Sequence, residues 1–106
     1  MEGLPGKVIR WTFTDGPMPN AFEHTFRDDG TLVWRVLDGP MKGGSGEEKR
    51  YSAFRVSDDV YAISYLGASG HTLTVILNVR DQRMVGFASN DKEWFALNGR
   101  VDSVSR

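Results

Sequence analysis

Two histidines and a tyrosine are the side chains best suited to chemistry in this chain. His24, His71 and Tyr65 each alternate with apolar residues, as in the FEHTF run at residues 22–26. Alternate residues of a strand point to one face, so we expect all three side chains to face the interior of a sheet. Each histidine could donate a hydrogen bond to a ligand, or be satisfied by the protein at a core or rim position. The Tyr65 hydroxyl could orient a ligand or bind a backbone carbonyl.

Metal and cofactor chemistry is not indicated by these residues. Two histidines need at least one further ligand to hold a metal ion, and no carboxylate stands at a suitable spacing. The chain has no cysteine, which excludes thiolate ligands and disulfides. We therefore predict no metal and no cofactor.

An aromatic set accompanies the histidines on the face that we expect to be internal. It consists of Trp11, Phe13, Phe22 and Phe26. Such a set usually forms a hydrophobic core. Beside a cation it would suit a flat anionic ring compound.

Short strands without a helix must position these residues. Apolar and polar residues alternate at 9–13, 22–26, 32–36, 61–65, 73–77 and 85–87, and turn-forming residues separate the runs. This pattern predicts an all-β antiparallel up-and-down barrel of about eight strands. Closure removes exposed strand edges, and the inside of a small barrel can hold one ligand. Inward-facing Met84, Gly86 and Ala88 would leave room for a ligand, or would merely accommodate a tryptophan across the barrel.

The strand at 32–36 is apolar on both faces. Leu32, Trp34 and Val36 form one face, and Val33 and Leu37 lie on the other. We interpret the first set as outward-facing and in need of cover. A symmetric contact would supply that cover, so the sequence predicts a homodimer.

Size and charge bound the remaining possibilities. The 106 residues predict one domain, 1–106, with 13 basic and 14 acidic residues and a net charge of -1. This balance favours neither nucleic acid nor an anionic membrane as a partner. No apolar run approaches a membrane span, and the MEGLPG start lacks signal-peptide features, so we expect a cytoplasmic protein. Residues 38–48 are predicted to be a rim or lid loop, and residues 101–106 a short last strand or a frayed tail.

Several stretches resemble the family of molybdenum cofactor biosynthesis protein F (MoaF). They are WTF with DG at 11–16, FEHTF at 22–26, DGTLVWR at 29–35, DVYAISY at 59–65, GHTLT at 70–74 and MVG at 84–86. The resemblance covers about residues 6–97 and implies a lipocalin-like (calycin) barrel. Larger members of that family carry two such domains, and this chain matches one. The family name suggests molybdenum cofactor assembly, although no pterin- or molybdate-binding group can be recognised in these residues.

The same stretches are similar to the phenolic acid decarboxylases. The two catalytic tyrosines of that family fall at Trp11 and Phe13 here, its arginine at Arg35 and its glutamate at Gly67. Indole, benzyl and glycine cannot supply the O–H donors and the acid, so decarboxylase activity is not expected. The resemblance places Arg35 inside the barrel. There it would either pair with a carboxylate or grip an anionic ligand.

The leading hypothesis is therefore a non-enzymatic binding module for a small, partly aromatic anion. Its predicted ligand-binding residues are Arg35, Trp11, Phe13, Phe22, His24, Tyr65 and His71. One alternative is a lyase or isomerase that uses Arg35, His24 and Tyr65. Another is a dimeric scaffold with a filled interior.

Overall fold

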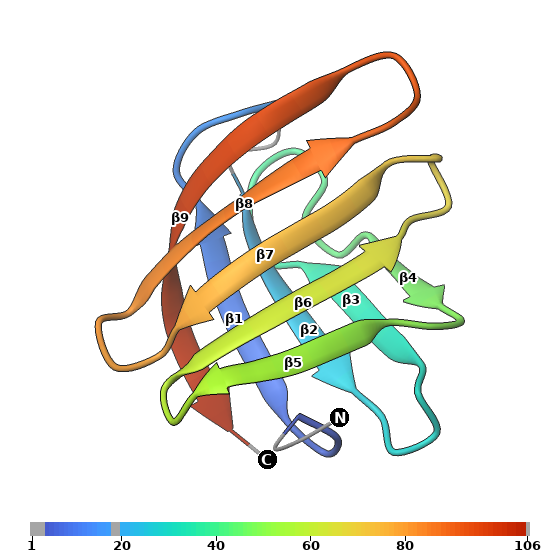
Figure 1. The fold of residues 1–106 in the computed structure, drawn as a ribbon. Helices are drawn as coiled ribbons and strands as arrows, with labels where there is room; N and C mark the ends of the chain where they lie inside the picture. The colour runs from blue at the N-terminus through green and yellow to red at the C-terminus, as the bar shows by residue number, and fades with distance from the viewer. Residues whose placement is uncertain (1–3, 18–19, 106) are drawn as a thin grey trace.

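Nine antiparallel strands make up the fold, which we describe from a computed structural model covering residues 4–17 and 20–105. The strands are β1 (Val8–Phe13), β2 (Ala21–Phe26), β3 (Leu32–Val36), β4 (Ser45–Glu48), β5 (Ser52–Ser57), β6 (Val60–Leu66), β7 (Thr72–Asn78), β8 (Arg83–Ser89) and β9 (Trp94–Ser105). They form one sheet in the order β4-β3-β2-β1-β9-β8-β7-β6-β5. Figure 1 shows the sheet curling over itself, with β5–β8 in front of β1–β4.

The sheet is a half-barrel with an open seam. β1 pairs with β9, which joins the two ends of the chain. β4 and β5 follow one another in the chain but form the two free edges of the sheet in the described residues. The predicted all-β antiparallel barrel is confirmed, with nine strands instead of about eight and with the seam as a departure from full closure.

Two segments are more regular than the sequence indicated. The predicted loop at 38–48 contains β4, which pairs Ser45–Glu48 with Leu32–Arg35 of β3. Gly46 makes this pairing possible, because a Cβ atom there would lie 2.6 Å from the Trp34 ring. The tail belongs to the twelve-residue β9, and Arg106 lies outside the described residues.

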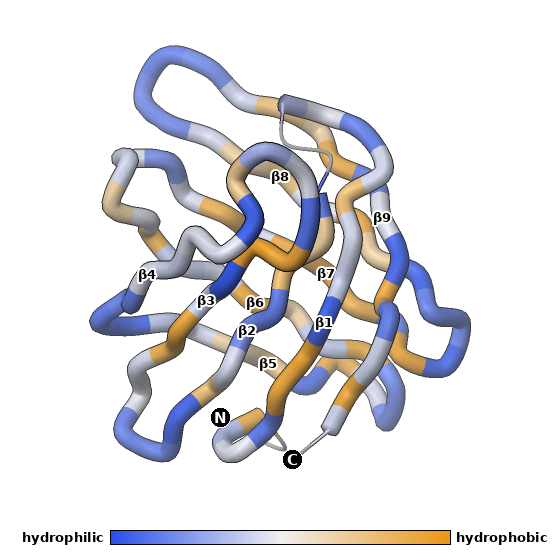
Figure 2. Tube along the Cα trace, turned by 180° about the vertical axis from the view of Figure 1, so that it is seen from behind, coloured by the Kyte–Doolittle hydropathy of each residue, from blue (hydrophilic) through white to orange (hydrophobic). Residues whose placement is uncertain are grey.

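Alternation fills the space between the two layers with apolar side chains. The aromatic residues of β1 and β2 are buried there together with Ile63, Val75 and Leu77. Figure 2 shows hydrophobic segments along the strands and hydrophilic ones at most of the connecting turns. Gly86 leaves no space for a ligand, since a Cβ atom there would lie 2.2 Å from the Thr74 carbonyl oxygen. Its role is to let β7 and β8 approach closely.

The orientation predicted for β3 is wrong. Its register sets Leu32 opposite Phe26 and Val36 opposite Phe22, and cross-strand partners share a face. Leu32 and Val36 are therefore buried in the core, and Trp34 packs half-buried against it. The outward patch from which the homodimer was predicted does not exist.

The same register puts Arg35 on the outer surface, so the expectation that it faces the interior is also wrong. Arg35 lies opposite Glu23 and pairs with its carboxylate at 3.1 Å, and the arginine side chain is 52% exposed. Arg10 holds the second Glu23 oxygen at 2.8 Å. The partner of Arg35 is thus the outward carboxylate on the neighbouring strand.

Candidate functional site

A groove opens at the seam of the half-barrel. Its volume is about 660 Å³, within the range typical of ligand pockets. One wall is residues 47–52 and the other is residues 64–68 with Thr72. The pairing of β5 with β6 stops at Ser52 and Ser64, so the chain before Ser52 departs from β6. The groove occupies the resulting gap.

Glu48 provides a buried carboxylate in this groove. Only 7% of the residue is exposed, and its Oε2 atom accepts a hydrogen bond from Trp34 Nε1 at 3.0 Å. It faces inward because it pairs with Leu32, whereas the preceding Glu47 points outward and pairs with Arg27. A buried carboxylate is costly unless it is well paired. Glu48 was not predicted as a site residue because it lay in a predicted loop.

Tyr65 stands in the wall facing Glu48 and connects the groove to His24. Its hydroxyl lies 2.8 Å from His24 Nε2. Burial, with a smaller contribution from the Glu48 charge, raises the pKa of Tyr65, and burial lowers the pKa of His24 to about 3. Both groups are therefore uncharged near neutral pH.

The tautomer of His24 decides what the Tyr65 hydroxyl can do. With the proton on Nδ1, Tyr65 donates to Nε2. With the proton on Nε2, the histidine donates to the tyrosine oxygen, and the phenolic proton is free for a group in the groove. In both cases Nδ1 is buried and has no partner among the described residues.

The other aromatic residues predicted to bind a ligand lie in the core. The Trp11 ring stacks on His24 with centroids 4.0 Å apart, and Phe13 meets Phe22 edge to face at 5.6 Å. These four residues are at most 6% exposed, and none lines the groove. They pack in the core around His24, and the His24–Tyr65 hydrogen bond links this core to the groove. Of the predicted set, only Tyr65 lines the groove itself.

Glu48 on β4 brings its carboxylate close to Gly67 on the facing wall of the groove. A Cβ atom on Gly67, which the sequence resemblance matches to the decarboxylase glutamate, would lie 3.9 Å from Glu48 Oε2. A carboxylate therefore reaches this part of the barrel from β4, on a different strand. Lys49 and Arg50 lie at the exposed edge of the same groove, and they are the cations that a bound anion would meet.

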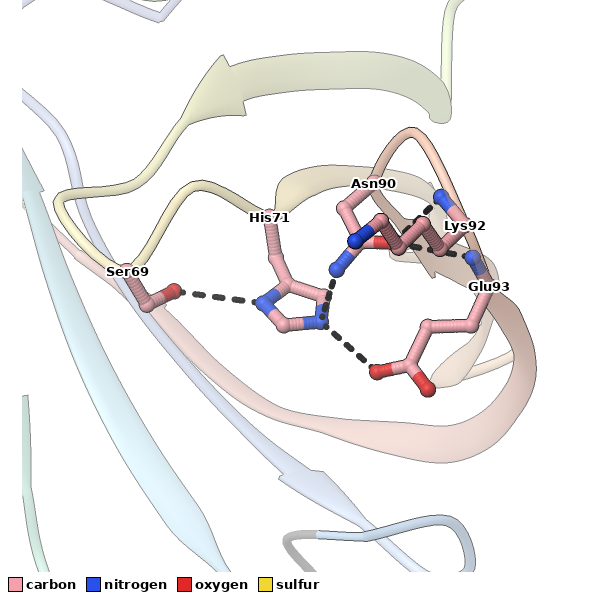
Figure 3. Close-up of polar contacts among 5 residues, drawn as sticks. All are labelled: Ser69, His71, Asn90, Lys92 and Glu93. Carbon is pink, nitrogen blue, oxygen red and sulfur yellow. Dashed lines mark hydrogen bonds and ion pairs between the residues drawn. The ribbon is translucent and has the colours of Figure 1, made fainter.

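His71 lies at the rim in a separate polar cluster (Figure 3). Its Nε2 atom is 3.4 Å from Glu93 Oε1 and 3.2 Å from Asn90 Nδ2, and its Nδ1 atom is 3.5 Å from Ser69 Oγ. The serine, histidine and glutamate resemble a hydrolase triad in composition. Hydrogen bonds around Asn90 argue against that reading.

The Asn90 amide turns its NH2 group toward His71. Its Oδ1 atom accepts the backbone N–H groups of Lys92 and Glu93, so Nδ2 is the donor that faces His71. When Nε2 accepts from this amide, the ring proton lies on Nδ1, which points at Ser69; when Nε2 carries the proton, it donates to Glu93 Oε1. In the first of these tautomers, Nδ1–H cannot remove a proton from Ser69. The cluster ties the β8–β9 turn to the β6–β7 turn, and its contacts of 3.5 Å to Ser69 and 3.4 Å to Glu93 are longer than those of a closely hydrogen-bonded relay.

Within residues 4–17 and 20–105, no three His, Asp or Glu side chains gather as a metal site would require. No helix in that part of the chain has the length and apolar character to cross a membrane.

Among the comparisons with known proteins, a solved structure shows the fold and a family model shows the family. A search of curated proteins finds no match. A crystal structure described as a candidate beta-lactamase from Burkholderia vietnamiensis has a TM-score of 0.77 and 20% identity, with 94% of each chain covered. At this identity the similarity shows the fold alone. The family model of the MoaF N-terminal domain matches residues 1–93. The chain therefore belongs to the MoaF N-terminal domain family.

Proposed function

We propose that the domain binds a small, flat, partly aromatic anion in the groove at the barrel seam. The observation that carries this proposal is the placement of Glu48 and Tyr65 on facing walls of a groove of about 660 Å³. A ring compound with N–H groups would donate to Glu48. Its anionic substituent would reach Lys49 and Arg50 at the groove edge.

In this proposal Lys49 and Arg50 bind the anion, a role that the sequence suggested for Arg35. Arg35 already pairs with Glu23 on the outer surface, and it does not line the groove. Lys49 and Arg50 have the required charge and do line it. The inner carboxylate adds a requirement that the sequence did not suggest, namely that the ligand presents hydrogen-bond donors on the edge opposite its anionic group.

A pterin is one ligand class with these properties, and the family name makes it the first to test. Its ring is flat, its amino and N–H groups can donate to one carboxylate, and its biological forms carry anionic substituents. A role in molybdenum cofactor biosynthesis is part of this proposal. It is supported by the family and by the Glu48 carboxylate.

Nuclear magnetic resonance titration of the whole chain with 6-carboxypterin tests the proposal. We expect shifts in the amides of residues 47–52 and 64–68. The variant Glu48→Gln keeps an acceptor for Trp34 and should weaken binding by roughly tenfold or more, equivalent to about 1.4 kcal/mol. Glu23→Gln is the matched control, because Glu23 pairs with Arg10 and Arg35 on the outer surface and does not line the groove; we expect no change in binding for it.

Benzoate separates the two parts of the recognition. It has the ring and the charge but no N–H donor, so it should bind more weakly and should not distinguish Glu48→Gln from the wild type. Absence of shifts with 6-carboxypterin, or shifts confined to the outer surface, would refute binding in the groove.

An acid–base enzyme is the second candidate function. Glu48 and Tyr65 could exchange a proton with a compound held between them, which would suit a lyase or isomerase. Decarboxylation of hydroxycinnamic acids is not expected, because Trp11 and Phe13 are buried in the core and have no phenol group. Turnover of such an acid would overturn that expectation and favour the enzyme.

A further inference from the structure

The buried Nδ1 atom of His24 bears on the direction of the hydrogen bond between His24 and Tyr65. His24 is 1% exposed, Trp11 stacks on its ring, and Nδ1 has no hydrogen-bond partner among the described residues. Buried N–H groups without a partner are rare in proteins, and a buried acceptor without one is tolerated more often. Trp11 Nε1 is already such an N–H group in the same stacked pair. A proton on His24 Nε2 avoids a second one, because the Tyr65 oxygen lies 2.8 Å from that atom.

In this tautomer the phenolic proton of Tyr65 is left for a partner in the groove. The tyrosine oxygen accepts the Nε2–H bond, and the hydroxyl makes no other hydrogen bond in the described part of the chain. Tyr65 lines the groove, and Glu48 on the facing wall offers a carboxylate that accepts hydrogen bonds and does not donate them. The groove therefore presents one donor and one acceptor.

We propose that the groove selects a flat ring compound with an amide or lactam edge, whose carbonyl oxygen accepts from Tyr65 while its N–H group donates to Glu48. This inference rests on the proposed function and names the ligand edge that the same groove requires. The lactam of 6-carboxypterin has such an edge. An edge with donors alone would meet the phenolic proton, and an edge with acceptors alone would meet the carboxylate.

Tyr65 is then a specificity-determining residue, and His24 is a positioning residue that holds the hydroxyl as a donor. Nitrogen nuclear magnetic resonance of the ligand-free chain near neutral pH tests this step. We expect His24 Nδ1 to have the chemical shift of an unprotonated ring nitrogen, and Nε2 that of a protonated one. The chain has two histidines, so His71→Gln assigns the signals. A protonated Nδ1 would overturn the inference, whether or not a ligand binds in the groove.

Two matched probes test the ligand edge. 4-Carbamoylbenzoate has an N–H group beside a carbonyl, and 4-acetylbenzoate keeps the carbonyl but has a methyl group in place of the amino group. We expect the wild type to bind the first more tightly. Tyr65→Phe should weaken both by roughly three- to tenfold, the loss of one hydrogen bond. Tyr61→Phe is the matched control, because Tyr61 is buried on the same strand and does not line the groove; it should leave both affinities unchanged.

The outcomes separate this inference from the proposed function. Equal wild-type affinity for the two probes, or an affinity for 4-acetylbenzoate that Tyr65→Phe leaves unchanged, would show that the amide edge is not selected, although binding in the groove would stand. If neither these probes nor 6-carboxypterin binds, the proposed function fails and the ligand class fails with it. Circular dichroism melts check that Tyr65→Phe folds, and the nitrogen measurement does not depend on that variant.

Discussion

Both histidines of this chain were predicted from strand alternation to face the interior, but they occupy opposite environments. His24 is buried, stacks on Trp11 and meets the Tyr65 hydroxyl behind the groove. His71 is 33% exposed at the rim and shares its ring nitrogens among Ser69, Asn90 and Glu93. Strand parity alone does not separate them. Position along the strand does, because His24 lies in the middle of β2 and His71 directly precedes β7.

The largest expected difference between the two histidines is their effect on folding stability at acidic pH. Burial holds the pKa of His24 at about 3, whereas an unfolded histidine titrates near 6.5. Below pH 6.5 the unfolded chain binds a proton that the folded chain does not, so stability falls as pH falls. The slope is about 1.4 kcal/mol per pH unit, or about 2–3 kcal/mol between pH 6.5 and 4.5. Urea unfolding across this range measures it.

The variants His24→Gln and His71→Gln show which histidine causes the slope of stability against pH. The first should flatten it, and the second should leave it in place. Asp15 and Asp29 have pKa values lowered by hydrogen bonds from Asn98 and Thr31, and their contribution to stability is lost at lower pH, as these carboxylates protonate. An unchanged slope in His24→Gln would show that His24 protonates readily in the folded protein.

The next largest difference concerns the hydroxyl partners. Tyr65→Phe leaves buried His24 Nε2 without its partner and should lower stability by about 1–2 kcal/mol. Ser69→Ala removes the hydroxyl beside exposed His71 and should change stability by less than about 0.5 kcal/mol. Chemical denaturation at pH 7 compares them. Equal losses would contradict the contrast between a buried and a rim cluster.

A smaller effect is expected on the outer surface. Arg35→Met removes an exposed ion pair and leaves Glu23 paired with Arg10, so the loss should be about 0–1 kcal/mol. Binding of a probe in the groove should not change. A loss of binding in Arg35→Met by titration calorimetry would restore Arg35 as a ligand-binding residue.

The fold was predictable from the sequence where alternation is strong. The FEHTF run correctly placed Phe22, His24 and Phe26 inside, and the turn residues separated most of the strands. Alternation does not predict the orientation of β3, because both of its faces are apolar. Only the register with β2 decides which face is buried.

The candidate site was less predictable. β4 has the sequence SGEE, which lacks the apolar residues that mark a strand, so Glu48 gave no signal of burial. The groove depends on where the β5–β6 pairing ends, and residue patterns do not report that point. Tyr65 was identified because it alternates with Tyr61 and Ile63 on a clear strand. The groove thus joins one predictable wall to one that only the tertiary structure reveals.

The stability of ligand-free Glu48→Gln tests the account most directly. If Glu48 is retained to bind a ligand, removing its buried charge while keeping an acceptor for Trp34 should leave the protein as stable as the wild type, or more stable. If the charged carboxylate instead anchors β4 through a charge-assisted hydrogen bond from Trp34, the glutamine forms a weaker bond and the same change should cost stability. Thermal melts of the two proteins without ligand decide this. An equal or higher melting temperature is the predicted result, and a large drop would contradict the assignment of Glu48 to ligand binding.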